Sequence, residues 1–434
     1  MDGLERVSIA DLRDHVGKTV EVRGWLYSQR SSGKISFLLV RDGTGIVQGV
    51  LVEKEVDPST WSAHHALTQE SSLVVRGTVR EDARAPGGYE LSLSHVEPFQ
   101  IARDYPIGPK EHGIDFLLNH RHLWLRSTRP WHVMRIRDEL IFAIREFFRE
   151  QDFVCIDSPI LTKAIGEEAG SLFETEYFDL GAASLAQTGQ LYVEAGAMAH
   201  GKVYCFGPTF RAEKSKTRRH LTEFWMLEPE MAWYDWEDNM ALQEELIEFL
   251  VKRVLERRSQ DLSGLGRETA SLMRVQRPFP RLAYDEAVEL LKLKGSSIEW
   301  GQDFGGEDQT LLTEQFDRPV FVHSFPKAVK AFYMKEHPQR PYLVLCNDLF
   351  APEGYGEIIG GSQREDDHDR LIERIREQGL PEAAYDWYLD LRKYGSVPHS
   401  GFGLGLERTV SWICGLDHLR EAIPFPRLIN RITP

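Results

Sequence analysis

The sequence lacks the features that mark several large classes of protein. Its 434 residues include only four cysteines, which are widely spaced and form no CxxC pair, so neither a disulfide framework nor a clustered zinc site is indicated. Apolar runs are short: none reaches the roughly 18 residues of a membrane span, and residues 1–20 contain no signal-peptide core. We therefore expect a cytoplasmic protein with no membrane partner, in a reducing compartment.

Basic residues are also in short supply. The chain has 52 Lys and Arg against 67 Asp and Glu, for a formal net charge of -15. Because nucleic acids bind through their phosphates to Lys and Arg, this balance argues against such a partner unless basic residues gather locally. They do so at 211–220 (RAEKSKTRRH) and within 23–41. The acid elsewhere would limit non-specific RNA binding and make specific binding salt-dependent.

The sequence contains neither of the two commonest nucleotide-binding motifs. No GxxxxGK[ST] pattern occurs, and the segment 401–410, GFGLGLERTV, places its glycines at every second residue, unlike the GxGxxG dinucleotide motif. Alternate glycines remove the side chains from one face of a strand, which lets a ligand or another segment approach closely. A nucleotide, if one binds, is therefore not held by a P-loop.

Residues 1–103 have the pattern of a small β-barrel. Short β-rich segments are separated by Gly and Asp-Gly turns, and a helix is expected around 58–69. The expected strands are 19–30, 35–42, 45–53, 72–81 and 89–101. Their number and spacing predict a five-stranded barrel.

A linker at 104–130 precedes a larger region, 131–434, with a different pattern. Apolar residues three and four apart predict an amphipathic helix over 131–151. Strands are expected at 154–161, 185–193, 202–211, 222–233, 318–325, 341–350 and 356–364, and helices at 238–258, 366–378, 381–394 and after Gly405. Because strands seldom alternate one for one with helices, the region predicts an α+β fold on a mostly antiparallel sheet.

Three segments of this region gain meaning in combination. They are the helix and strand that end at Pro159, the basic loop after FRAE with Phe224 beyond it, and the alternating glycines followed by Glu-Arg. Each alone also fits a structural role, as an edge strand, a solvated basic hairpin or a strand packed under a helix. In this order, at about 131–161, 203–231 and 401–414, they resemble the three motifs of the class II aminoacyl-tRNA synthetases. The resemblance implies an antiparallel sheet flanked by helices, and a homodimer with Pro159 at its interface.

The resemblance also implies how ATP and Mg²⁺ would be bound. Arg211 would hold the α-phosphate and the amino-acid carboxylate, Arg408 would lie against adenine and the γ-phosphate, and Glu213 would lie near adenine; these three are the expected catalytic residues. Further ATP contacts are implied for Arg219, His220, Phe224, Glu357 and Gly405, and Glu357 would also bind the metal. Taken alone, Glu357 fits a salt-bridged strand residue as well. Fixed arginines and Mg²⁺ would stabilise charge on the phosphates without a protein nucleophile.

The barrel narrows the resemblance to the subgroup that charges tRNA with aspartate, asparagine or lysine. In that subgroup an OB-type barrel binds the anticodon. Phe37 and Gln48 fall where that subgroup has a base-stacking Phe and a Gln that recognises the central uracil, and Arg30 lies on the same surface. Stacking on aromatics is how such barrels take single-stranded bases. Considered alone, Phe37 could also be a core aromatic.

The segment 188–198, TGQLYVEAGAM, aligns with the subgroup's amino-acid pocket, where Gln190 would face the substrate α-amino group. Aspartyl enzymes carry a lysine three residues later, but this chain has Val193, so a second substrate carboxylate would be left uncompensated. Glu228 could accept from a side-chain amide and Arg364 could donate to it. We therefore expect asparagine as the substrate and tRNA(Asn) as the acceptor.

One further residue of the pocket is implied by the resemblance. Glu167, in the stretch GEEAG, resembles an acid that lies near the substrate amino group. The subgroup commonly has EGAG at this place. Glu168 stands where the glycine would be, so the assignment between Glu167 and Glu168 stays open.

Three alternatives remain open on the sequence. An aspartyl enzyme is disfavoured by Val193 and by the short segment between the second and third motifs, which leaves no room for a large extra domain. A tRNA-independent asparagine synthetase on the same catalytic domain is disfavoured by the barrel. An inactive tRNA-binding paralogue is disfavoured because every motif position that the chemistry needs is filled.

Overall fold

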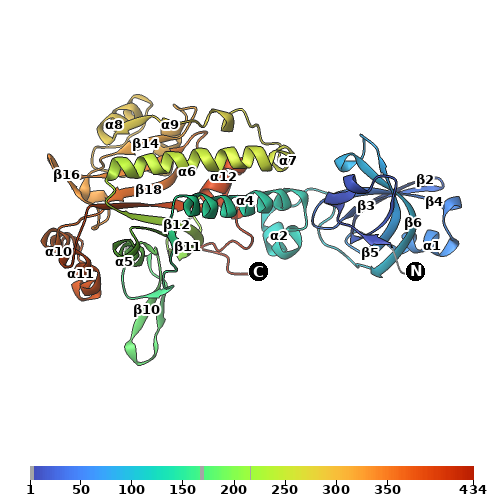
Figure 1. The fold of residues 1–434 in the computed structure, drawn as a ribbon, viewed down its shortest axis with the longest axis horizontal. Helices are drawn as coiled ribbons and strands as arrows, with labels where there is room; N and C mark the ends of the chain where they lie inside the picture. Colours follow the sequence, from blue (N-terminus) through green and yellow to red (C-terminus); the bar gives the residue numbers. More distant parts are fainter. Residues whose placement is uncertain (1–3, 167–170, 216) are drawn as a thin grey trace. The chain divides into compact units, whose positions relative to one another are not determined.

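The computed structural model describes residues 4–166, 171–215 and 217–434. They form two compact units, Met1–His112 and Gly113–Pro434 (Figure 1), and each unit has its own buried apolar cluster. Within the described ranges, no helix combines the length and apolar character that a membrane crossing needs.

The first unit is a closed barrel of five strands. These are β2 (Thr19–Ser32), β3 (Ile35–Arg41), β4 (Ile46–Val52), β5 (Ser72–Glu81) and β6 (Tyr89–Gln100), and a short β1 (Glu5–Arg6) pairs with β2. The order is β2-β3-β4-β6-β5, and β5 pairs back with β2, which closes the barrel. The side chains alternate along each strand between a buried core and the outer face, as the pleat requires. The expected five-stranded OB-type barrel is confirmed.

One helix crosses the barrel between β4 and β5. It is α1 (Pro58–Ala66), in the place where a helix around 58–69 was expected. Asp57 caps it: its carboxylate accepts from the backbone N–H groups of Ser59 and Thr60, each at 2.9 Å. Pro58 occupies the first helical position, where the missing N–H costs nothing.

The second unit begins with short helices and a long one. α2 (Ile114–Asn119) and α3 (Arg121–Trp124) lie in the stretch expected as a linker, and α4 (Thr128–Glu150) follows. The buried Arg121 guanidinium donates to the carbonyls of Ile423 and Pro424, at 2.9 and 2.8 Å, and so ties the start of this unit to its end. α4 confirms the amphipathic helix expected over 131–151.

An eight-stranded sheet forms the centre of the second unit. In spatial order its strands are β13 (Arg281–Ala283), β14 (Val320–His323), β17 (Cys346–Ala351), β18 (Gly356–Gln363), β19 (His399–Gly405), β12 (Glu223–Ala232), β11 (Lys202–Phe210) and β7 (Val154–Cys155). Among the described residues, the inner strands all pair antiparallel, whereas the two edge strands pair in parallel. The mostly antiparallel α+β sheet is confirmed.

Helices pack against this sheet. α6 (Trp236–Arg257) contacts α4, and Figure 1 shows both running along the sheet. α12 (Leu406–Cys414) follows β19 directly and contacts α4 and β12. Apolar side chains from these helices and from the central strands form one buried cluster.

Smaller elements surround this core. The helices are α7 (Ser259–Gly264), α8 (Tyr284–Leu293), α9 (Gly306–Thr313), α10 (His368–Glu377) and α11 (Asp386–Lys393). Two small sheets comprise β8 (Leu161–Thr162), β9 (Glu174–Glu176) and β10 (Ala182–Leu185), and β15 (Glu336–His337) with β16 (Arg340–Val344).

The strand expected at 185–193 is wrong. β10 ends at Leu185, and α5 (Gln190–His200) begins within the expected strand. The buried positions Gln190, Val193, Glu194 and Ala197 follow the helical spacing of three and four, which the short apolar run up to Val193 could not reveal.

Two further expected strands are interrupted in the structure. The strand expected at 154–161 is reduced to β7 and the start of β8, with Pro159 between them, because proline cannot donate to a strand ladder. The strand expected at 341–350 is two strands, β16 and β17, separated at Leu345, whose N–H donates to the carbonyl of Lys335 instead of continuing either strand.

Candidate active site

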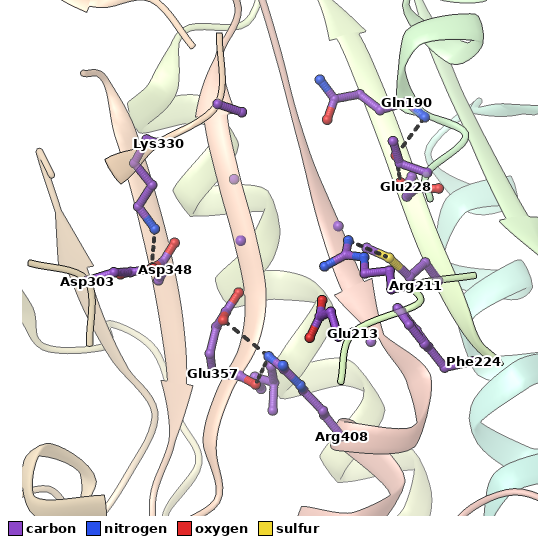
Figure 2. A pocket seen from close by; sticks show the side chains of 18 of the residues that line it. Gln190, Arg211, Glu213, Phe224, Glu228, Asp303, Lys330, Asp348, Glu357 and Arg408 are labelled. Atoms are coloured by element: carbon purple, nitrogen blue, oxygen red, sulfur yellow. Dashed lines mark hydrogen bonds and ion pairs between the residues drawn. The ribbon is translucent and has the colours of Figure 1, made fainter. Parts of the chain in front are cut away.

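A cavity of about 660 Å³ opens on the central sheet of the second unit. It is lined from β12, β18, β19 and the loop 211–222 between β11 and β12, and residues 328–331, 333 and 334 form another part of its wall. Most residues that the sequence analysis singled out in this unit line it: Gln190, Arg211, Glu213, Arg219, His220, Phe224, Glu228, Glu357, Arg364, Gly405 and Arg408. Figure 2 shows Gln190 and Glu228 near one another, with Glu357 and Arg408 at a distance from them.

The alternating glycines of β19 leave room for side chains of the neighbouring strand β12. A Cβ at Gly401 would lie 2.2 Å from Oε1 of Glu230, and a Cβ at Gly403 would lie 2.5 Å from Cε of Met226. A larger residue at 403 would push the Met226 side chain away, and one at 401 would also meet the backbone carbonyl of Pro229, 2.4 Å from its Cβ. The sheet floor of the cavity depends on these glycines.

The loop 211–222 carries the first group of candidate nucleotide contacts. The Arg211 guanidinium lies over the Phe224 ring, with its carbon 5.4 Å from the ring centroid. Oε2 of Glu213 lies 3.3 Å from Nε2 of His220. Burial lowers the pKa of His220, although Glu213 opposes this shift. The Arg211 guanidinium is suited to bind a phosphate, and the Phe224 ring is suited to stack against a base.

Arg219 secures this loop to two other segments. Its guanidinium donates to the carbonyls of Gly306, at 3.0 Å, and Gly354, and to the Thr310 hydroxyl at 2.7 Å. These acceptors are neutral, and burial lowers the pKa of Arg219 to about 10. Gly356, at φ +78°, leaves space for the guanidinium, because a Cβ there would lie 2.9 Å from one of its nitrogens.

Glu357 and Arg408 form an ion pair on the same cavity wall. The guanidinium donates to the Glu357 carboxylate at 3.1 Å and to its backbone carbonyl at 3.0 Å. Burial would raise the pKa of Glu357, but Arg408 and Lys330 outweigh it and hold the pKa low. Glu357 is therefore ionised at neutral pH.

The structure adds Asp348 and Lys330 to this wall, which the sequence analysis missed. The Lys330 ammonium donates to Oδ2 of Asp348 at 2.7 Å, yet burial raises the pKa of Asp348 to about 7. Asp348 pairs with Gly360 across the β17–β18 hairpin. A Cβ at Gly360 would lie 3.1 Å from Oε1 of Glu357 and 3.7 Å from Oδ1 of Asp348, so the glycine leaves the space between two carboxylates open. Only the hairpin register reveals this pair.

In the other part of the cavity, Gln190 is hydrogen-bonded to a buried network of charged residues. The Gln190 amide donates to Oε1 of Glu194 at 3.2 Å. The other Glu194 contacts come from Tyr388 at 2.6 Å, Arg392 at 2.7 Å and His399 at 2.9 Å. Burial alone would raise the pKa of Glu194, but Arg392 and His399 hold it well below its usual range. The i, i+4 spacing of Gln190 and Glu194 was readable, had the helix been recognised.

Arg364 and Glu230 form the second buried pair here. The Arg364 Nε lies 3.1 Å from both Glu230 oxygens, a further guanidinium nitrogen also donates to Glu230, and another donates to the Ser362 hydroxyl at 2.6 Å. Burial opposes the charge of Arg364, but Glu230 raises the pKa of the guanidinium above its usual value. The side chain of Val193, by contrast, packs in an apolar cluster with Ala197 and Val203 and does not line the cavity.

The three expected anticodon residues share the outer face of the barrel. Arg30 pairs with Phe37 across β2 and β3, and its guanidinium carbon lies 4.8 Å from the Phe37 ring centroid. Gln48 on β4 is opposite Leu39, two positions from Phe37, and its amide donates to Glu90 at 3.3 Å. Phe37 is half-buried on the outer face, so it is not a core aromatic.

Two remaining expectations fall elsewhere. Pro159 is exposed, in the segment between β7 and β8. Val154, Ile160 and Leu161, in or next to this segment, are exposed apolar residues, and so is Phe142 on α4. Glu167 lies outside the described residues. Within the described residues there is no cluster of three or more His, Cys, Asp or Glu with metal-binding geometry.

Comparison with known proteins places this architecture in a family. Residues 113–429 match the model of class II tRNA synthetases (D, K and N), and residues 20–99 match the OB-fold nucleic acid binding domain. A protein named asparagine--tRNA ligase from Desulforamulus reducens is 58% identical over 98% of this chain and 99% of its own.

Two solved structures have the same fold over the whole chain. The asparaginyl-tRNA synthetase of Pyrococcus horikoshii, complexed with asparaginyl-adenylate, is 46% identical with a TM-score of 0.96, and the match covers 100% of both chains. An aspartyl tRNA synthetase from Entamoeba histolytica is 26% identical with a TM-score of 0.83, over 100% of this chain and 93% of the other. The resemblance drawn from the sequence is therefore confirmed: the chain belongs to the class II tRNA synthetases of the D, K and N group.

Proposed function

We infer that the protein is an asparagine–tRNA ligase. It activates L-asparagine with ATP and transfers the asparaginyl group to the terminal adenosine of tRNA(Asn). The observation that carries this conclusion is one cavity that holds an acceptor and a donor for a side-chain amide, Glu228 and Arg364, together with the cations Arg211 and Arg408. The higher identity to proteins named for asparagine than to the one named for aspartate supports the choice of amino acid.

The first step joins the two substrates. A carboxylate oxygen of asparagine attacks the α-phosphorus of ATP, the bond to the bridging oxygen breaks, and pyrophosphate leaves with the negative charge. We assign the charge stabilisation to Arg211 at the α-phosphate and to Arg408 at the γ-phosphate, since fixed cations act best where charge develops. In the second step a ribose hydroxyl of the tRNA attacks the acyl carbon, and AMP leaves.

Other nucleotide contacts come from the loop and its neighbours. Phe224 offers a face for adenine, and Glu213 and His220 hold one another beside it. Gly405 lies at the start of α12, next to Arg408. Arg219 lines the cavity and fastens the loop, and its direct contact with ATP stays a prediction.

The carboxylates of Glu357 and Asp348 fit a magnesium ion, because they flank the open space at Gly360 and Mg²⁺ prefers oxygen ligands. One or two carboxylates, completed by phosphates and water, is the usual way in which this ion is held. When bound, it would neutralise phosphate charge.

Asparagine is favoured by the charges around the substrate side chain. Glu228 is buried near the Arg364–Glu230 pair and near Arg211, so two carboxylates and two guanidiniums already balance around the side-chain site. A neutral amide adds no charge to this set, whereas a substrate carboxylate would add a third negative group in a buried place. Gln190, held by Glu194, would face the α-amino group, with Glu167 as a further contact.

The barrel and the exposed apolar segment suggest two partners. Arg30, Phe37 and Gln48 present a cation, a ring and an amide on one face, which suits the stacked bases of an anticodon. The apolar residues around Pro159 suit a second copy of the chain, because exposed apolar groups of this kind mark interfaces.

The assignment to regions and compartment stays part of this proposal. Residues 1–103 would bind the anticodon, 104–130 would act as a hinge, and 131–434 would carry the chemistry. The cytoplasm, where tRNA is charged for translation, is the proposed location.

The test is amino-acid-dependent ATP–pyrophosphate exchange, followed by charging of tRNA(Asn) transcript. Asparagine should support exchange far better than aspartate, and the charged product should carry asparagine. Faster exchange with aspartate would overturn the amino-acid assignment. Formation of free asparagine from aspartate and ammonia, without tRNA, would overturn the ligase assignment.

A further inference from the structure

Glu228 receives its hydrogen bonds from neutral donors. The Thr188 hydroxyl donates to Oε1, and the Gly189 backbone N–H and the Cys205 thiol donate to Oε2, at 2.8 and 3.5 Å. The neighbouring carboxylate, Glu230, is instead paired with a guanidinium. Two glutamates two residues apart on β12 are thus held in different ways.

The chain topology brings these donors together. Cys205 on β11 is the direct cross-strand partner of Glu228 on β12, so their side chains lie on the same face of the sheet. Gly189 lies where the segment after β10 meets this face. A Cβ there would lie 2.6 Å from Sγ of Cys205 and 2.4 Å from Oγ of Ser158. Without a side chain at 189, the Ser158 hydroxyl reaches the thiol, and the thiol reaches Glu228.

The hydrogen-bond capacity of Glu228 is nearly filled by these groups. An ionised carboxylate accepts at roughly four lone-pair sites. Three are taken here, and Glu228 also lines the cavity, which leaves one acceptor for a ligand. An ionised Glu228 can accept from the NH₂ group of asparagine but has no hydrogen to offer the carboxylate of aspartate. A protonated Glu228 could donate to that carboxylate and so admit aspartate.

Burial and the donors act on Glu228 in opposite directions. Burial raises the pKa of Glu228 and outweighs the Thr188 hydroxyl, the Gly189 N–H and the Cys205 thiol, each of which lowers it. The charged groups that face it are Arg211, which also lowers the pKa, and the Glu230–Arg364 pair beside it on the sheet. The donors are therefore placed to limit how far burial raises the pKa of this carboxylate.

We propose that Thr188 and Cys205 are positioning residues that hold Glu228 as a pure acceptor, and that this restriction excludes aspartate from the side-chain site. The proposal rests on the asparagine activity inferred above and adds the residues that set its selectivity. Ser158 supports Cys205 from the segment that precedes Pro159.

The test uses Thr188→Val, Cys205→Ala and the double variant in ATP–pyrophosphate exchange. Valine matches threonine in shape but removes both the donor to Glu228 and the acceptor of the Gln190 backbone N–H, so Cys205→Ala is the variant that removes a donor to Glu228 and leaves the Gln190 N–H bonded. The loss of a hydrogen bond to a charged group should raise the KM for asparagine about ten- to a hundredfold in Thr188→Val, and a few-fold in Cys205→Ala, because a thiol is a weak donor. The KM for ATP should stay within about twofold of the wild-type value.

The pH profile separates this role from a merely structural one. Removal of donors to the charged form raises the pKa of Glu228, so the protonated form gains population as the pH falls. In the double variant, the ratio of aspartate-dependent to asparagine-dependent exchange should rise at least tenfold between about pH 8.5 and pH 6. In the wild type, where the donors oppose the effect of burial, the ratio should change much less over this range.

Three control variants complete the design. Thr188→Ser and Cys205→Ser restore a hydroxyl donor and should return the ratio and its pH profile to those of the wild type. Cys414→Ala removes another buried thiol, at the end of α12, and should leave both unchanged. If the double variant fails to fold, Cys205→Ala alone carries the same readout on a smaller scale.

A pH-independent ratio in a folded double variant, with an unchanged KM for asparagine, would overturn this proposal and leave the ligase assignment intact. No asparagine-dependent exchange in the wild type would instead overturn the ligase assignment and, with it, this proposal.

Discussion

The amino-acid and nucleotide parts of the cavity treat charge in opposite ways. In the amino-acid part, Arg364 is 2% exposed and Glu230 0%, and the side chains of Glu194 and Arg392 are both 0% exposed. In the nucleotide part, Arg408 is 33% and Glu357 30% exposed. The first set is fully enclosed before any substrate arrives, whereas the Glu357–Arg408 pair remains accessible to a charged ligand, beside the more buried Lys330–Asp348 pair.

This difference in exposure indicates a different role for each set of charges. A buried ion pair contributes little when complete but costs about 3–5 kcal/mol when one partner is removed, because the other charge is left without compensation. Charges that are about one-third exposed, such as Arg408 and Glu357, keep part of their hydration, so removal of a partner costs less stability. Loss of a charge should therefore affect stability in the amino-acid part and catalysis in the nucleotide part.

The largest expected effect is on stability, from Glu194→Ala. Arg392 and His399 would lose their shared carboxylate inside the protein, so the free energy of unfolding should fall by about 3–5 kcal/mol. Urea unfolding of the purified protein measures it. Glu194→Gln, which keeps the volume and one acceptor, is the matched variant and should lose less. A fall in the free energy of unfolding of less than about 1 kcal/mol in Glu194→Ala would contradict the expected difference between the two parts of the cavity.

Arg211→Ala should show the opposite pattern. Adenylate formation should fall by about a hundred- to a thousandfold, as for the loss of one fixed group that stabilises transition-state charge. Its urea midpoint should stay near that of the wild type, because this guanidinium lies over the Phe224 ring at the cavity wall. Pre-steady-state adenylate formation is the measurement. Near-normal activity would remove Arg211 from the reaction.

Glu357→Gln sharpens the comparison within the nucleotide part. The amide keeps the shape but lacks the charge that pairs with Arg408 and that we assign to magnesium binding. The magnesium concentration for half-maximal exchange should rise about tenfold, with little change in the KM for asparagine. Titration of MgCl₂ at saturating ATP measures it. An unchanged magnesium dependence would place the ion elsewhere.

The smallest expected effect lies outside the cavity, in Phe37→Ala. The loss of one base-stacking ring should weaken tRNA binding by about 1 kcal/mol, the lower end for such a contact because Phe37 is already half-buried, and raise the KM for tRNA about fivefold. Exchange without tRNA should stay at the wild-type rate, which makes this variant a control for both parts of the cavity. Ile35→Ala, on the same strand and exposed, is the matched substitution and should change neither quantity. An equal effect of the two variants would count against stacking by Phe37.

The sequence located more of the nucleotide part than of the amino-acid part. Arg211, Phe224 and Arg408 stand in recognisable motifs, and all three line the cavity. The support for Gln190 was not predicted, because Arg392 and His399 lie about 200 residues away from Glu194 along the chain. Nothing in local composition brings such distant residues together.

Hairpin register and helix identity account for the other omissions. Asp348 faces Gly360 only when β17 and β18 are paired as they are in the fold. Glu194 lies one helical turn after Gln190 only when the segment is a helix, and the apolar run up to Val193 favoured a strand. The resemblance implied an ATP contact for Arg219, but its hydrogen bonds to the carbonyls of two other segments depend on loops that the sequence does not place.

The missing Cβ of Gly401 has a consequence for anyone who wishes to redesign the pocket for another amino acid. The space that it leaves is bounded by the carboxylate of Glu230, which orients Arg364, and by the backbone carbonyl of Pro229, 2.4 Å from where a Cβ would lie. A shorter residue at 230 removes only the first obstacle, because the carbonyl belongs to the backbone. A combinatorial library should therefore keep glycine at 401 and vary positions 230 and 364 together.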